Sequence, residues 1–214
     1  FGCSLTIFPN TVFTYSGRKR RYGKQKIRMM NLPETNPAHF ARDVVKAALE
    51  YKTLPDPPDE EFYRQQAACF VSIKKDGNLR GCIGTLEPAE KDLGQEILRN
   101  AQSAAFGDPR FPGVTVEEFD HLSFSVDVLS KPEEVDSSGE LDCRRYGVIV
   151  SREYRRGVLL PDLEGVDSIE QQLGIACQKA GIDPTDKFAI QRFTVSRFDE
   201  GWQPGVDPAS CRAC

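Results

Sequence analysis

The chain has 214 residues, with 28 Lys or Arg, 32 Asp or Glu and a formal net charge of −4. This length suits one domain or two small ones and allows a core without disulfide cross-links. No run approaches the ~18 apolar residues of a membrane-spanning helix, and Gly and Pro follow no repeat, so a transmembrane or collagen-like protein is excluded.

Charge is distributed unevenly along the chain. Residues 1–28 carry seven bases and no acids, which leaves 21 basic and 32 acidic residues in the rest. An acidic body is a poor match for a phosphate backbone, so nucleic-acid binding is not expected of it. RNA binding through residues 1–28 is a separate hypothesis, which applies only if this basic segment belongs to the native protein.

The N-terminal segment has two interpretations. The chain begins with Phe1, and its only methionines are Met29 and Met30. One hypothesis is that translation starts there, so that residues 1–28 are an upstream extension or a fragment edge. The alternative is a genuine flexible basic arm. We therefore divide the chain into a disordered basic extension over residues 1–30, a domain over 31–200 and a C-terminal tail over 201–214.

The first helix begins at a strong capping signal. Asn36 is a good N-cap, and Pro37 suits the first helical position. Apolar residues then recur at three- and four-residue steps as far as Tyr51, which predicts one buried stripe. The proline-rich segment 54–58 ends the helix.

The next elements alternate between strands and helices. Residues 69–75 and 79–86 predict two strands joined by a turn at 76–78. Residues 92–106 predict an amphipathic helix, and the following segment 107–113 is a loop punctuated by Pro and Gly.

The second half of the chain continues this pattern. Strict alternation predicts a strand over 121–130, and 146–151 and 156–160 predict a hairpin. A helix is expected over 168–180 and a last strand over 189–198. Helices interleaved with hairpins indicate an α+β fold with a mainly antiparallel or mixed sheet flanked by helices. We find no internal repeat in the sequence.

Cysteine usage indicates a reducing environment. Four of the seven cysteines lie inside apolar patterns, where free thiols behave as small hydrophobic side chains: Cys69, Cys82, Cys143 and Cys177. They do not suggest a disulfide framework, so we expect a cytoplasmic protein. The pair Cys211 and Cys214 is either a metal or redox pair or part of a frayed tail. No Cys/His cluster has metal-ligand spacing, and no cofactor is predicted.

The segment with chemical content is Leu-Arg-Gly-Cys-Ile-Gly at 79–84. Residues two apart in a strand share a face, so Arg80 and Cys82 project together. The hairpin register is open: a two-residue turn places Cys82 opposite Val71, and a three-residue loop places Cys82 opposite Ser72. We favour the three-residue loop, which places Arg80 opposite Lys74 and separates polar from apolar side chains.

Two interpretations of this segment remain open. Gly81 and Gly84 weaken a strand, and one reason for them is the close approach of a ligand or another backbone. A guanidinium beside a thiol stabilises the thiolate, so Cys82 is either a reactive thiolate held by Arg80 or a structural cysteine at a tight crossing. His121 is a candidate base for such a thiol.

Three motifs resemble the AMMECR domain family, called AmmeMemoRadiSam system protein A in bacteria and archaea. They are the segment 79–85, the run Ala-Ala-Phe-Gly-Asp-Pro-Arg-Phe at 104–111 and Arg-Arg-Gly-Val-Leu-Leu-Pro at 155–161. Segments 163–167 and 178–181 resemble the bacterial branch. The resemblance runs from about residue 36 to 199.

The resemblance implies an α+β fold with a larger and a smaller subdomain around a cleft. It also implies two partners: a Memo-type protein that resembles extradiol dioxygenases, and a radical SAM protein. It implies no established reaction. Many members carry His-Gly where this chain has Tyr146-Gly147, which removes one candidate base.

Two function hypotheses follow. In the first, Cys82 and Arg80 are catalytic in a cysteine-dependent enzyme or modification factor that binds an anionic small molecule or a modified residue. The expected substrate-binding residues are Gly81, Gly84, Thr85, Asp108, Arg110, Arg155 and Arg156, since paired Arg forks suit anions. In the second, the chain is a non-catalytic adaptor for the same two partners.

Overall fold

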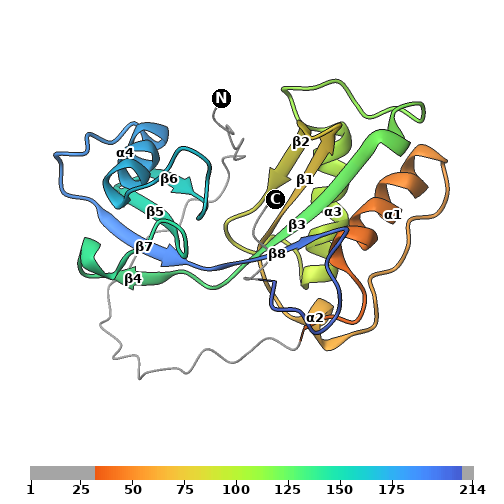
Figure 1. The fold of residues 1–214 in the computed structure, drawn as a ribbon, viewed down its shortest axis with the longest axis horizontal. Helices are drawn as coiled ribbons and strands as arrows, with labels where there is room; N and C mark the ends of the chain where they lie inside the picture. Colours follow the sequence, from red (N-terminus) through yellow and green to blue (C-terminus); the bar gives the residue numbers. More distant parts are fainter. Residues whose placement is uncertain (1–31, 209–214) are drawn as a thin grey trace. The chain divides into compact units, whose positions relative to one another are not determined.

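The computed structural model describes residues 32–208, which form two compact units (Figure 1). Within the described part, the first unit holds residues 32–126 and 198–208, and the second holds residues 127–197. The predicted basic extension, the alternative start at Met29 or Met30 and the pair Cys211 and Cys214 lie outside the described residues.

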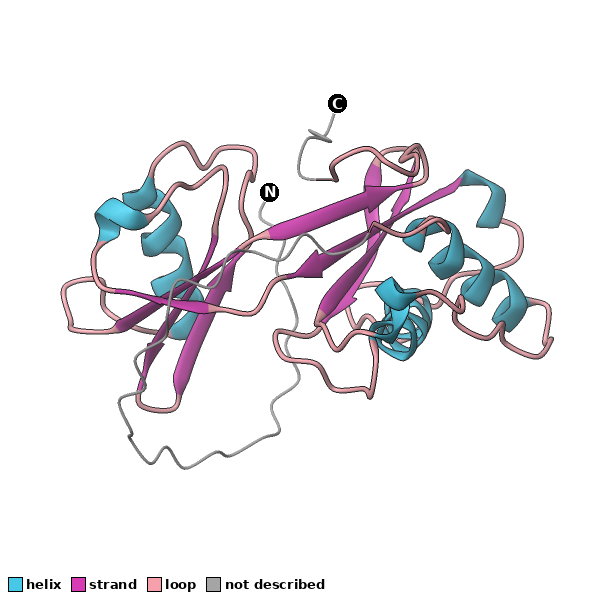
Figure 2. Cartoon of the chain, turned by 90° about the horizontal axis from the view of Figure 1, so that it is seen from below, coloured by secondary structure: helices cyan, strands magenta, loops and turns pink. Residues whose placement is uncertain are grey.

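The first unit is built on a four-stranded sheet of order β2-β1-β3-β8. Its elements are α1 (Pro37–Leu49), α2 (Glu61–Arg64), β1 (Cys69–Lys75), β2 (Asn78–Gly84), α3 (Leu93–Phe106), a 3₁₀ turn at Phe119–His121, β3 (Leu122–Leu129) and β8 (Val195–Asp199). The last two strands each continue across the boundary between the units, which falls after residue 126 in β3 and after residue 197 in β8. Helix α3 packs on β1 and β2, and α1 packs on α3. Figures 1 and 2 show both helices on one face of this sheet.

Helix α1 begins where its capping residues predict. The Asn36 side chain accepts a hydrogen bond from the backbone N–H of Ala38 at 2.8 Å. Its amide nitrogen also donates to the carbonyl oxygens of Asp199 and Trp202, at 2.8 and 3.1 Å. Trp202 is buried against the Phe198 ring. One asparagine thus caps α1 and ties its start to the segment expected to be a C-terminal tail.

The β1–β2 hairpin combines features of both expected registers. Lys75 faces Asn78 across a two-residue turn in which Asp76 and Gly77 both have positive φ, as a type I′ turn requires. Further along, Cys82 faces Ser72 and Ile83 faces Val71. These two pairings were predicted, but the turn is shorter than predicted.

A β-bulge reconciles the two registers. Ile73 pairs with Gly81 and Lys74 pairs with Leu79, so Arg80 is the extra residue of β2. The predicted pairing of Arg80 with Lys74 is therefore wrong. A bulge re-aims the side chain of the inserted residue, because that residue has no partner on the opposite strand.

The second unit has a four-stranded sheet of order β4-β7-β5-β6. Its elements are β4 (Glu133–Val135), a 3₁₀ turn at Ser138–Glu140, β5 (Gly147–Arg152), β6 (Arg155–Leu159), α4 (Ile169–Ala180) and β7 (Ala189–Phe193). Ser168 and Gln171 form a capping box at the start of α4, and Gly181 ends the helix with φ of 65°. The core packs aliphatic side chains of β5, β6 and α4.

The two units repeat one topology that the sequence did not reveal. In each, a hairpin is followed by a helix that packs on it, and the next strand pairs with the first strand of the hairpin: β1-β2-α3-β3 and β5-β6-α4-β7. A glycine marks the helix crossing in both. A Cβ on Gly81 would lie 2.2 Å from the Ala104 carbonyl oxygen, and one on Gly157 would lie 2.0 Å from that of Ala176.

The α+β class and the antiparallel sheets are confirmed, and a cleft between subdomains stays a prediction. The single last strand predicted over 189–198 is wrong, because it is two strands in different sheets. The break falls at Thr194, whose N–H donates to the Ser130 hydroxyl and whose carbonyl accepts from the Ser130 N–H. No helix within residues 32–208 is both long and apolar enough to cross a bilayer.

We expect Gly81→Ala and Gly157→Ala each to lower the free energy of unfolding by about 2–4 kcal/mol, because a Cβ would overlap a backbone carbonyl that cannot move alone. Gly174→Ala is the matched control: it lies inside α4 with nothing within 4 Å of a Cβ. That change should stabilise the protein by up to about 1 kcal/mol. Urea denaturation measures all three, and an unaltered midpoint for Gly81→Ala would contradict the packing argument.

Candidate functional site

The Cys82 thiol is buried in the first unit. Its side chain lies on β2, and the residue is 4% exposed. The Ser72 hydroxyl, across the hairpin, donates to Sγ at 3.2 Å. All four cysteines within the described residues are buried thiols, as predicted.

Two side chains cover the backbone of Cys82 at the edge of the sheet. Strand β2 is an edge strand, and the Cys82 N–H donates to Oδ2 of Asp108 at 2.9 Å. The Cys82 carbonyl accepts from Nη2 of Arg110 at 3.2 Å. The same two side chains bind each other, with Nε to Oδ1 at 2.9 Å and Nη2 to Oδ2 at 2.6 Å. This ion pair therefore replaces a neighbouring strand at Cys82.

The environment of Asp108 keeps it ionised. Burial would raise the pKa of this carboxyl group, but hydrogen bonds from the Arg110 guanidinium and from the N–H groups of Cys82 and Arg110 outweigh that effect. Together they lower the pKa of Asp108 to about 2. Its negative charge compensates the positive charge of Arg110 at neutral pH.

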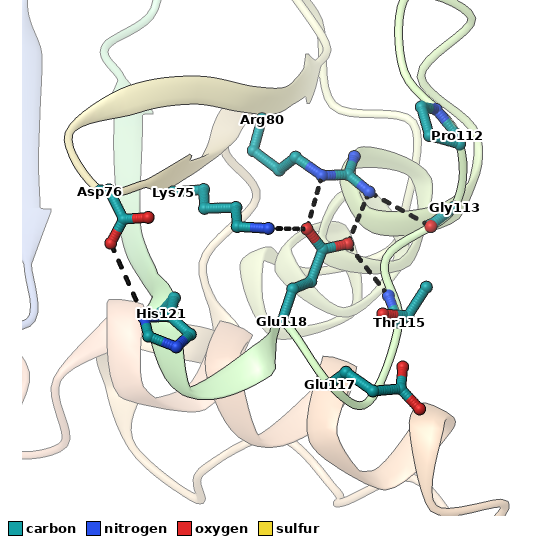
Figure 3. Close-up of a pocket in the computed structure, with 9 residues that line it drawn as sticks. All are labelled: Lys75, Asp76, Arg80, Pro112, Gly113, Thr115, Glu117, Glu118 and His121. Carbon is teal, nitrogen blue, oxygen red and sulfur yellow. Dashed lines mark hydrogen bonds and ion pairs between the residues drawn. The ribbon is translucent and has the colours of Figure 1, made fainter.

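Arg80 binds Glu118 instead of extending to solvent (Figure 3). Its Nε donates to Oε2 at 3.1 Å and its Nη2 donates to Oε1 at 2.7 Å, and Nη2 also reaches the Gly113 carbonyl at 3.2 Å. Lys75 Nζ donates to Oε2 at 3.2 Å, and the Thr115 N–H donates to Oε1 at 3.1 Å. Hydrogen bonds from Arg80 lower the pKa of Glu118 to about 2, although burial acts in the opposite direction.

Thr85 takes part in a second buried network. Its hydroxyl donates to Oε1 of Glu96 at 2.6 Å, while the N–H groups of Ala89 and Glu90 both donate to Oε2 at 2.8 Å. Glu96 is fully buried on α3. This carboxylate fixes the loop that follows β2.

The glycines expected to contact a substrate are packed against protein. The Cβ position of Gly81 is taken by the α3 backbone, and that of Gly84 lies 2.1 Å from the Phe70 ring. The sequence left two explanations for these glycines, the close approach of a ligand or that of another backbone. At both Gly81 and Gly84 the neighbouring atoms belong to the protein itself.

Arg155 and Arg156 lie in the second unit. Nη1 of Arg155 donates to the Gly181 carbonyl at 2.6 Å, and Arg156 is exposed opposite Ser151 on the β5–β6 hairpin. Their expected role in binding an anionic substrate stays a prediction, as does that of the other five predicted substrate-binding residues.

A pocket of about 580 Å³ lies beside the Arg80–Glu118 pair. It is lined by the β1–β2 turn, Arg80, the segment 112–118 and His121, and Cys82 is absent from its lining. The imidazole of His121 is 64% exposed and lies 3.7 Å from the Asp76 carboxylate. Within residues 32–208, no three His, Cys, Asp or Glu side chains are grouped so that they could hold a metal ion.

Sequence reasoning missed Glu96 and Glu118. Glu96 could have been found, because it lies three residues after Leu93 on the apolar stripe of a predicted helix, where a charge needs a partner. Glu118 has no such signal. It is adjacent to another glutamate, and its partner Arg80 lies 38 positions away.

Comparison with known proteins supports the family that the motifs suggested. Residues 38–200 match the family model AMMECR1, which is well over half of the chain. The chain belongs to the AMMECR1 family. The match includes the Cys82 segment, both networks around it and the whole second unit.

Relatives in the AMMECR1 family come from bacteria and archaea. A Thermotoga maritima protein is 48% identical over 164 residues, which cover 74% of this chain and 94% of that protein. A Clostridium acetobutylicum protein is 46% identical over 147 residues, 69% of this chain but 31% of that longer protein. The crystal structure of an uncharacterised Pyrococcus horikoshii protein is similar with a TM-score of 0.70 and 28% identity, covering 79% of this chain and 92% of that one.

We expect acid to weaken the first unit between about pH 4.5 and pH 2. Asp108 and Glu118 have folded pKa values of about 2, below their unfolded values of about 4. Each therefore stabilises the fold above the unfolded pKa, by on the order of 2 kcal/mol, and loses that contribution as pH falls through the folded pKa.

Urea denaturation from pH 7 to pH 2.5 measures this effect. Glu118→Gln should be less stable at pH 7 and should flatten the acid limb of the stability curve. The exposed Asp120→Asn is the control and should leave the curve unchanged. An acid limb with the same slope in Glu118→Gln and in the unaltered chain would rule out the assignment.

Proposed function

We propose that this AMMECR1-family protein is a non-catalytic binding module that presents a preformed loop to protein partners. The observation that carries the proposal is the burial of Cys82, which is 4% exposed. A nucleophilic cysteine needs a thiolate that an electrophile can reach, whereas buried structural cysteines are inert.

The charges around Cys82 support a structural role for its segment. The Arg80 guanidinium makes two hydrogen bonds to Glu118, and the Arg110 guanidinium makes two to Asp108. Each positive charge is therefore compensated by a carboxylate at hydrogen-bond distance. Neither ion pair therefore stabilises a second negative charge, whether on an anionic substrate or on a Cys82 thiolate.

These ion pairs fix the loop 107–118 in place. Asp108 and Arg110 attach its start to β2, Arg80 holds the Gly113 carbonyl, and the Val114 N–H donates to the Ala105 carbonyl at 2.9 Å. Loops of this length without secondary structure are usually functional or disordered. A loop that is ordered before binding loses little conformational entropy on binding.

The fixed loop and the end of α3 display apolar side chains. Phe106 is 43% exposed and Val116 is 61% exposed, while Phe111 lies beneath the guanidinium groups of Arg80 and Arg110. Aromatic residues and arginine are the types that dominate binding energy at protein interfaces. The family resemblance indicates the partners: a Memo-type protein and a radical SAM protein.

A cysteine-dependent reaction is the second candidate, and one observation favours it. The Ser72 hydroxyl donates to Cys82 Sγ at 3.2 Å, and a hydrogen bond of this kind would stabilise a thiolate. In that case Cys82 is the nucleophile and Arg80 its electrostatic partner.

The reactivity of Cys82 separates the two candidates. In the full chain near pH 7.5, we expect iodoacetamide to modify Cys82 at least about tenfold more slowly than free cysteine, because the thiol is buried. Peptide mass spectrometry resolves it from the other six cysteines. The same protein in urea is the control and should react at the free rate. If Cys82 in the folded protein is modified as fast as free cysteine, the result would favour the cysteine-dependent reaction.

Association with partners tests the binding module directly. Val116→Glu should weaken capture of the Memo-type or radical SAM protein from the same genome at least about tenfold, because it places a charge on the apolar surface. Tyr154→Glu, a 90% exposed position on the second unit, is the matched control. Cys82→Ser should leave capture unchanged. Capture that survives in Val116→Glu but fails in Tyr154→Glu would place the interface elsewhere.

A further inference from the structure

The last part of loop 107–118 contains an exposed arch, residues 115–117, between two buried side chains. Val114 before the arch is 5% exposed and Phe119 shortly after it is 7% exposed, whereas Val116 in the arch is 61% exposed. All three arch residues are exposed. Packing therefore holds the chain on either side of the arch, and the position of the arch itself depends on hydrogen bonds.

The carboxylate of Glu118 connects the arch to the β1–β2 hairpin (Figure 3). On the arch side, Oε1 accepts from the Thr115 N–H at 3.1 Å. On the hairpin side, the two oxygens accept two hydrogen bonds from Arg80 and one from Lys75. A carboxylate has about four acceptor positions, so the protein itself uses all of them. Within residues 32–208, no hydrogen bond links the arch to the hairpin directly.

The start of the loop has a separate anchor. Asp108 and Arg110 bind the backbone of Cys82 at the edge of β2, and these hydrogen bonds share no atom with those of Glu118. Removing the Glu118 carboxylate would thus leave the start of the loop attached while the arch loses its link to the hairpin. Local opening of this kind is expected where a segment has few buried apolar contacts.

We infer that Glu118 is the positioning residue of the proposed binding surface: its carboxylate holds the arch in one conformation and so fixes the place of Val116. The Glu118 side chain is 12% exposed, so it acts through the arch and not by contact with a partner. The effect on partners rests on the proposed function, whereas the ordering of the arch does not. A partner that meets an ordered arch loses less conformational entropy and associates faster than one that must order it.

Backbone ¹⁵N relaxation of the full chain measures the order of the arch. We expect order parameters of about 0.85 at residues 115–117 in the unaltered chain and below about 0.6 in Glu118→Gln. Residues 108–111 should stay ordered in both. Asp120→Asn, at an exposed carboxylate nearby, is the matched control and should leave the arch ordered.

A second variant keeps this test decisive if Glu118→Gln does not fold. Lys75→Met removes one of the four donors and retains the carboxylate, so it should lower the order parameters of the arch by a smaller amount. An arch that stays ordered in every folded variant of this pair would overturn the inference.

Partner association separates positioning from a general loss of stability. With a partner that the unaltered chain captures, Glu118→Gln should lower the association rate constant at least about fivefold and change the dissociation rate constant less. Gly157→Ala is the control: its Cβ would overlap the Ala176 carbonyl in the second unit, far along the chain from the arch, and it should associate at the unaltered rate. An equal decrease in both variants would overturn the inference. If the unaltered chain captures no partner, the proposed function fails, and the order parameters still decide the role of Glu118.

Discussion

The first unit depends on how the open edge of β2 is satisfied at Cys82. A backbone N–H and carbonyl at a sheet edge need partners, and an unpaired edge is prone to pairing with another chain. Here a carboxylate and a guanidinium supply them, and both belong to one loop. Because that ion pair must stay in register with β2, the loop 107–118 takes one conformation, which places Gly113 and Glu118 within reach of Arg80.

The repeated topology shows which parts of this arrangement the fold requires. Both units contain a glycine where a helix carbonyl crosses the hairpin, so that glycine is a packing requirement. In the second unit, Val158 follows this glycine as Cys82 does in the first, and Asp183 after α4 accepts from Thr185 instead of covering β6. The motif therefore folds without the ion pair at Cys82. The ion pairs of the first unit are additions to the motif, and they shape the loop and the pocket.

Burial and charge compensation around Cys82 are the reasons for proposing a binding role for this protein. Buried ion pairs hold their geometry well because removing one partner leaves an uncompensated charge. The Asp108–Arg110 and Glu118–Arg80 pairs are partly buried, so the same argument applies to them in part. They make a rigid surface next to a closed thiol. Phe106 at the end of α3 and Val116 on the loop add exposed apolar side chains to it, which is why we propose a binding role.

Local features of this protein could be predicted from its sequence. The Asn36 cap, the α3 stripe, the hairpins and the buried cysteines all follow from short-range patterns, because caps and side-chain periods involve residues a few positions apart. The family could also be identified, since its motifs are contiguous. Tertiary structure alone decided the bulge at Arg80, its pairing with Glu118 and the division of the last strand at Thr194. These depend on which distant backbone groups meet in space, and no local period encodes that choice.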